Sequence, residues 1–172
     1  MAMTAKEQQR FLLGAQTCIS PYLEMLGRIN AECSTCSRDE DRKNIFEGIR
    51  SSVGFAKLSR MVFSILEGWM EEQLRGQALA SACAGDTEGE MQWSLLLSLF
   101  FRAQGKLDQA IEINKVVLDS AKDKQSAMAQ SASLSIATIY GEFGRHDDAL
   151  KLKEDLLKSS GSINHRFQGA QI

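Results

Sequence analysis

The chain has 172 residues, of which 44% are hydrophobic and 24% are charged, and its formal net charge is −2 at pH 7. This composition is typical of a folded globular protein and argues against wholesale disorder. A charge so near zero gives no electrostatic reason to expect nucleic acid or acidic lipid as the main partner.

Three features of the sequence favour a cytoplasmic protein. No apolar run reaches the roughly 18 residues that a membrane span needs, and the N-terminus lacks the apolar core of a secretory signal. The four cysteines do not have the spacing of a disulfide framework, as expected of reduced intracellular thiols. We therefore predict a cytoplasmic location and no membrane insertion.

Residues 1–84 are predicted to form three or four helices. Thr4 is a candidate N-cap of the first helix, because Glu7 stands three residues later, as in a capping box. Ser20 and Pro21 predict the start of a second helix, with the serine as N-cap and the proline as the first helical residue.

A third helix is predicted from about Asp39, and a strongly amphipathic segment follows at residues 55–74. Gly54 stands between them, and the sequence leaves open whether the helix breaks at this glycine or continues through it. The segment 77–84 is rich in alanine, and the run GDTEGE at residues 85–90 predicts a turn followed by another helix start.

Residues 92–121 and 131–160 have nearly the same pattern, displaced by 39 residues. Each copy predicts a helix, a turn at a glycine and a second helix, because glycine adopts the left-handed conformation that ends a helix at no steric cost. A small alanine then stands where the two helices are expected to cross most closely. The matching pairs are Phe101 and Tyr140, Gly105 and Gly144, Ala110 and Ala149, and Leu118 and Leu157.

The aromatic residue, the turn glycine and the small crossing residue resemble the tetratricopeptide repeat in their spacing, over less than half of the chain. The period is 39 residues rather than about 34, and Lys122 and Gly161 replace the late proline of the family. The longer period is similar to that of kinesin light chain and its relatives. The resemblance implies an all-α fold in which antiparallel helical hairpins stack into a superhelix, with a concave face that binds a peptide or partner protein.

Candidate partner-binding residues follow from this resemblance, and they are Leu95, Leu99, Arg102, Leu134 and Thr138. One subclass of the family clamps a terminal carboxylate with basic and amide side chains, but the corresponding positions here carry leucine, serine and threonine. We therefore predict an apolar helix as the ligand. The alternative is that the helices of residues 1–84 cover this apolar surface as part of the core.

No residue pattern predicts catalysis, so we predict that the chain is not an enzyme and has no cofactor. Cys33 and Cys36 have the spacing of a zinc or redox pair, but no second ligand pair accompanies them. We interpret them as structural or incidental cysteines. His146 stands beside Asp147 and Asp148 in a turn, where a polar side chain solvates the start of a helix.

We divide the chain into an N-terminal helical segment at residues 1–84, two helical hairpins at 85–163 and a flexible tail at 164–172, within one continuous domain. The first segment is interpreted either as degenerate repeats or as a cap. The predicted function is that of an adaptor or scaffold that binds another protein. Two alternatives stay open: the chain self-associates, because two repeats are few for a solenoid, or it is part of a longer repeat array in a signalling or transport protein.

Overall fold

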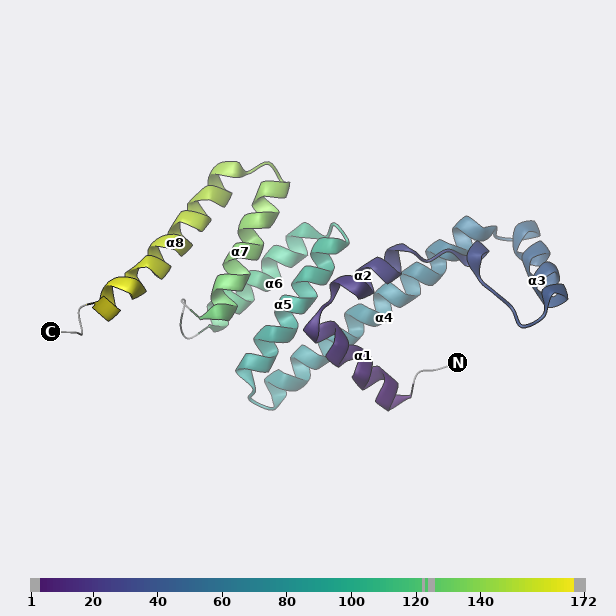
Figure 1. Ribbon diagram of the computed structural model, residues 1–172, viewed down its shortest axis with the longest axis horizontal. Helices are drawn as coiled ribbons and strands as arrows, with labels where there is room; N and C mark the ends of the chain where they lie inside the picture. Colours follow the sequence, from purple (N-terminus) through teal and green to yellow (C-terminus); the bar gives the residue numbers. More distant parts are fainter. Residues whose placement is uncertain (1–3, 122, 124–125, 169–172) are drawn as a thin grey trace. The chain divides into compact units, whose positions relative to one another are not determined.

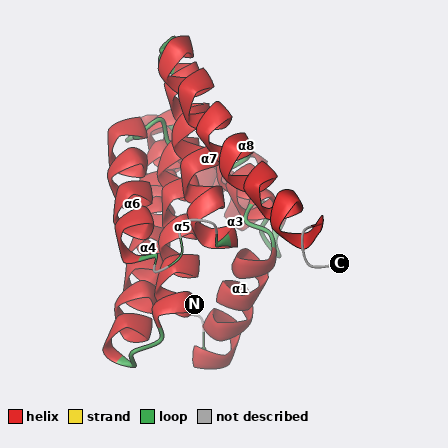
Figure 2. Cartoon of the chain, turned by 90° about the vertical axis from the view of Figure 1, so that its left-hand side faces the viewer, coloured by secondary structure: helices red, strands yellow, loops and turns green. Residues whose placement is uncertain are grey.

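The structure is a computed structural model that describes residues 4–121, 123 and 126–168. Within these ranges the chain is all-helical, with eight α-helices, one 3-10 helix and no strand (Figure 2). The predicted all-α class is therefore confirmed. The chain divides into two compact units, Met1–Gln73 and Leu74–Ile172, which we call the N-terminal unit and the C-terminal unit.

The N-terminal unit contains α1 (Ala5–Thr17), α2 (Ser20–Gly27), η1 (Ala31–Cys33), α3 (Asp39–Ser51) and the first part of α4 (Phe55–Cys83). The capping box predicted for α1 is confirmed: the Thr4 amide donates to Glu7 Oε2 at 2.8 Å, and the Glu7 amide donates to Thr4 Oγ1 at 3.3 Å. At the start of α2 the N-cap is Ile19 rather than Ser20, and Ser20 and Pro21 are the first helical residues. Proline is accommodated there because the first turn has no intrahelical partner for its missing N–H.

The break between α3 and α4 resolves a point that the sequence leaves open. Gly54 has a φ of 74°, the left-handed conformation that side chains other than glycine rarely adopt. Its amide donates to the Ile49 carbonyl at 2.8 Å, which closes the end of α3. The helix α4 then runs without interruption for 29 residues and includes the alanine-rich segment 77–84 up to Cys83.

The C-terminal unit contains the end of α4 and four further helices, α5 (Thr87–Ala103), α6 (Leu107–Ser120), α7 (Ala127–Glu142) and α8 (His146–Gln168). The helix α5 packs against α6, α6 against α7 and α7 against α8, and α5 also contacts α7 (Figure 1). The helix α8 includes residues 164–168, which the sequence analysis expected in a flexible tail. Residues 169–172 of that tail lie outside the described residues.

The turns of the two hairpins have the same hydrogen bonds at equivalent positions. Gly105 and Gly144 have φ values of 72° and 73°, so the predicted left-handed glycines are confirmed. After them, the Lys106 amide donates to the Phe101 carbonyl at 2.9 Å, and the Arg145 amide donates to the Tyr140 carbonyl at 2.8 Å. This bond, from a residue to the carbonyl five positions earlier, is the main bond of the Schellman motif and satisfies a carbonyl that the helix end leaves unpaired.

The same residues also form matching side-chain contacts. The Lys106 ammonium lies 5.5 Å from the centre of the Phe101 ring, and the Arg145 guanidinium lies 4.1 Å from the centre of the Tyr140 ring. Each contact places a cation over an aromatic face and holds the residue after the glycine against the preceding helix. These contacts are not apparent from the sequence, although the two pairs have the same 39-residue offset as the rest of the repeat.

Candidate functional site

The candidate partner-binding residues lie on two helices that contact each other. Leu95, Leu99 and Arg102 are on α5, and Leu134 and Thr138 are on α7. Leu99 is 40% exposed and Leu134 is 52% exposed, whereas Leu95 is half-buried. We call the surface formed by Leu95, Leu99 and Leu134 the α5–α7 surface.

The helical period explains why these leucines are not in the core. Leu96, Leu97 and Phe100 are buried on the opposite side of α5, and Leu95 and Leu99 are four residues apart on the other face. On α7, Ala132, Ile136 and Ile139 are buried in the same way. The exposed leucines therefore belong to positions of α5 and α7 that the packing of the hairpins does not use.

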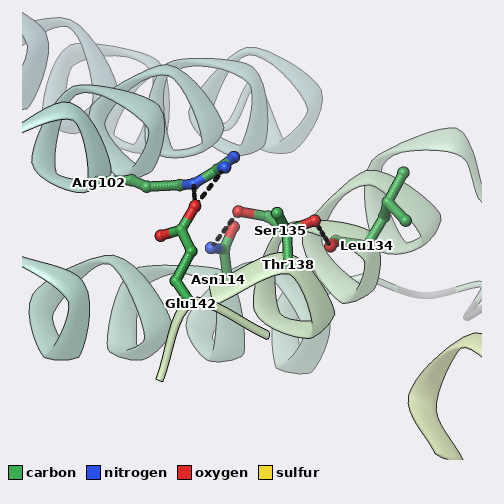
Figure 3. A network of polar contacts seen from close by, with 6 residues as sticks. All are labelled: Arg102, Asn114, Leu134, Ser135, Thr138 and Glu142. Atoms are coloured by element: carbon green, nitrogen blue, oxygen red, sulfur yellow. Dashed lines mark hydrogen bonds and ion pairs between the residues drawn. The ribbon is translucent and has the colours of Figure 1, made fainter. Parts of the chain in front are cut away.

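Arg102 is engaged in an ion pair rather than directed to a ligand. Its Nε and Nη2 atoms lie 2.9 Å and 2.5 Å from Glu142 Oε1 (Figure 3). Arg102 is at the end of α5 and Glu142 at the end of α7, so the pair links the same ends of the two helices. About a third of each side chain is exposed, and such pairs stabilise a protein by about 0–1 kcal/mol.

Thr138 is also engaged within the structure. Its hydroxyl donates to the Leu134 carbonyl, four residues earlier on α7, at 2.8 Å (Figure 3). This bond occupies the only hydrogen that the threonine hydroxyl can donate and leaves its oxygen as an acceptor. Arg102 and Thr138 thus form polar contacts within the chain, and the other three candidate residues are leucines, whose side chains form no such bonds.

A buried polar cluster lies beneath the α5–α7 surface and was not predicted from the sequence. Asn114 of α6 is fully buried, and its Nδ2 atom lies 2.6 Å from Ser98 Oγ on α5. It also lies 2.9 Å from Ser135 Oγ on α7 (Figure 3). The same nitrogen also lies 2.9 Å from the Ala110 carbonyl. One side chain therefore connects three helices, and its two N–H hydrogens are shared among three acceptors.

The N-terminal unit has a second concave feature, an apolar pocket of about 600 Å³ between α1, α2 and α4. Its centre is aromatic, because the Phe11 ring meets Tyr22 edge-on at 4.5 Å and Trp69 at 5.3 Å between ring centres. The lining residues are Gln8, Phe11, Tyr22, Met25, Leu26, Ile65, Leu66, Trp69 and Met70. Apart from the Gln8 amide and the Tyr22 hydroxyl these side chains are apolar, so the pocket is suited to holding an apolar group.

The titratable side chains with displaced pKa values are all on the surface of helix ends or helix faces. The Thr4 amide lowers the pKa of Glu7 by donating a hydrogen bond to its carboxylate. The hydrogen bond with Glu112 raises the pKa of Lys115, and that with Asp148 raises the pKa of Arg145. Each partner is three residues away in the sequence, so these shifts report local contacts within a helix or at its start.

The His, Cys, Asp and Glu side chains are the residues that could bind a metal ion or carry thiol chemistry. Within the described ranges, no three His, Cys, Asp or Glu side chains lie close enough together to hold a metal ion. Cys18, Cys33, Cys36 and Cys83 are all exposed thiols without a disulfide bond. Of the helices that the structure describes, none is long and apolar enough to cross a membrane.

Comparisons with known proteins give no further assignment. No protein-family model, curated protein or solved structure matches this chain.

Proposed function

We propose that the chain is a non-enzymatic scaffold whose C-terminal unit is a tetratricopeptide-like superhelix that binds a helix of a partner protein on the α5–α7 surface. The stacking order supports the repeat assignment: α5, α6, α7 and α8 pack in sequence, and the first helices of the two hairpins also touch. The matching left-handed glycines and the buried Ala110 and Ala149 support it further.

The observation that carries the proposal is the exposure of Leu99 and Leu134 on neighbouring helices. Full burial of a leucine side chain contributes about 1.5–3 kcal/mol. Because each of these leucines is already about half covered, a partner would gain roughly half of that from each. Exposed apolar side chains that form one continuous patch mark sites of contact with another protein, and we propose that Leu99 and Leu134 form such a patch with Leu95.

The polar residues at the edge of this surface support an apolar ligand rather than a charged one. Arg102 is neutralised by Glu142, and the Thr138 hydroxyl is bonded to its own helix. Neither side chain offers an unpaired cation to a terminal carboxylate of a peptide. We therefore propose an amphipathic helix that inserts apolar side chains between Leu99 and Leu134, in the helix-in-groove mode of recognition.

The apolar pocket of the N-terminal unit supports the same class of function, because it also offers apolar side chains and no acid–base pair. The four exposed thiols support a cytoplasmic location, since reduced cysteines are the norm in a reducing compartment. We propose on this basis a cytoplasmic binding protein whose two units each present an apolar surface.

The test uses photo-crosslinking followed by a binding measurement. A photoreactive amino acid is placed at position 99, at position 134 and, as a control, at position 116 on α6, where Val116 is also exposed. Cells that express the chain are irradiated, and proteins crosslinked at positions 99 and 134 but not at 116 are identified. The strongest of them is then purified and its affinity for the chain is measured.

We expect Leu99→Asp and Leu134→Asp each to weaken this affinity at least tenfold, which corresponds to about 1.4 kcal/mol. The matched variant Val116→Asp should bind normally, and far-UV circular dichroism should show that all three variants are folded. The proposal fails if no protein is crosslinked at 99 or 134 above the level at 116, or if the two leucine variants bind as tightly as the wild type.

A further inference from the structure

The second helices of the two hairpins carry equivalent residues on their outer faces but bury them very differently. In α6 the residues Ile111, Asn114 and Leu118 are three and four positions apart and lie on one face of the helix. The hydrogen bond from Asn114 to Ser135 shows that this face packs against α7. Ile111 is only 8% exposed there and Asn114 is fully buried.

The residues at the same offset in α8 are Leu150, Lys153 and Leu157. Leu150 is 58% exposed, Leu157 is 72% exposed and Lys153 is exposed between them. We call these three residues the outer face of α8. No helix among the described residues covers it in the way that α7 covers the corresponding face of α6.

A rotation of α8 does not explain the difference, because the inner faces of α6 and α8 agree. Ala110 and its counterpart Ala149 are both buried against the first helix of their hairpin. The next inner positions, Ile113 and Leu152, are both half-buried. The two helices thus sit in the same orientation in their hairpins, and only the outer neighbour differs.

We propose that the outer face of α8 docks a helix of a partner protein that presents apolar side chains and one central carboxylate. The α6–α7 interface supplies the template, because α7 meets Asn114 with Ser135 and carries fully buried Ala132 and Ile139 on the same face. A partner helix of this kind continues the existing interface by one more layer. Leu150 and Leu157 take the apolar role that Ile111 and Leu118 have in α6.

The carboxylate follows from the replacement of Asn114 by Lys153. Asn114 donates from its amide to the Ser135 hydroxyl, a neutral acceptor. The lysine ammonium has three donors and no acceptor and is charged, so covering it requires an anionic partner. An aspartate or glutamate at the place of Ser135 satisfies this requirement with a charge-assisted hydrogen bond, whereas a basic residue there is repelled.

The probes for the test are three peptides with the sequence of residues 126–142, each held helical by a covalent bridge on the face that does not contact α6. One has the natural Ser135, one carries Ser135→Glu and one carries Ser135→Lys. Their binding to the full chain is measured by fluorescence anisotropy. The chain is tested as the wild type, as Lys153→Glu, as Leu157→Asp and as the control Val116→Asp, which changes an exposed residue of α6.

We expect the Ser135→Glu peptide to bind the wild-type chain at least about tenfold more tightly than the Ser135→Lys peptide, as close interfacial charge pairs do. The order should reverse with Lys153→Glu, because the sign of the central charge is then reversed on the chain. Leu157→Asp should abolish binding of all three peptides, and Val116→Asp should leave it unchanged.

Three results would overturn the proposal. The first is the absence of binding of the Ser135→Glu peptide up to about 1 mM, the limit of weak specific affinity. The second is a peptide order that does not change with Lys153→Glu. The third is a concentration-dependent dimer in solution that Leu157→Asp dissociates, since that would assign the outer face of α8 to a second copy of the chain. This test is independent of the α5–α7 surface, because no variant of the chain changes Leu99 or Leu134, and Leu134 is the same in all three peptides.

Discussion

The α5–α6 and α7–α8 hairpins have the same turn and the same crossing residue, but they have different neighbours. Both turns have a left-handed glycine, a bond back to the aromatic residue and a cation over its ring. The aromatic residue itself differs, because Phe101 is fully buried and Tyr140 is half-buried. The outer face differs more strongly, since it is covered by α7 on α6 and exposed on α8.

The repeat thus contains residues that are determined within one hairpin and residues that are determined by the neighbouring helix. The backbone bonds of the turn and the small residue at the crossing are set by contacts inside one hairpin, and both copies have them. The residues of the outer face depend on what lies next to the hairpin. Asn114 is polar and buried because α7 brings it an acceptor, while the exposed Lys153 at the same position remains in water.

The largest expected effect comes from the pair of aromatic residues. We expect Phe101→Ala to lower the free energy of unfolding by about 3–5 kcal/mol, because a fully buried ring is replaced by a cavity. Tyr140→Ala should cost roughly half as much, since a half-buried ring loses less apolar contact. Urea denaturation followed by far-UV circular dichroism measures both values. Equal losses would show that the two hairpins bury their aromatic residues to the same extent.

A smaller effect is expected from Asn114 of α6 and Lys153 of α8, which stand at equivalent positions of the two hairpins. Asn114→Ala should lower the free energy of unfolding by about 1–3 kcal/mol, because the Ser98 and Ser135 hydroxyls lose the donor that Asn114 supplies. Lys153→Ala should change it by less than about 0.5 kcal/mol, as is usual at an exposed position. The same denaturation experiment compares the two, and a loss in Lys153→Ala as large as that in Asn114→Ala would contradict the different environments of these residues.

Features that depend on neighbouring residues in the chain could be predicted from the sequence. The capping box of Thr4 and Glu7 and the turns at Gly105 and Gly144 are set by a few adjacent positions, and the structure confirms them. The start of α2 was misplaced by one residue, because Ile19 and Ser20 are both compatible with a proline in the first turn. The sequence also predicts that the last helix ends before residue 164, whereas α8 continues to Gln168, because the polar residues after Ser160 carry little helical periodicity.

Features that combine distant residues could not be predicted in this way. Asn114 contacts side chains that are 16 and 21 positions away on two other helices, and an asparagine within a helix gives no sign of such partners. The aromatic pocket joins Phe11, Tyr22 and Trp69, which come from three helices with no shared repeat. The sequence does contain one sign of this difference. Asn114 and Lys153 stand at the same position of the repeat, and the change from asparagine to lysine marks a position whose environment differs between the copies.

The smallest effect concerns the ion pair that joins the two hairpins. Arg102 and Glu142 are partly exposed, so a double-mutant cycle with Arg102→Ala and Glu142→Ala should give a coupling energy of only about 0.2–1 kcal/mol. The coupling should disappear in about 1 M salt, where the screening length falls to about 3 Å. The cycle is measured by urea denaturation at low and high salt. A coupling that persists in high salt would mean that Arg102 holds the hairpins together by packing of its aliphatic stem, since screening acts on charges and leaves apolar contact intact.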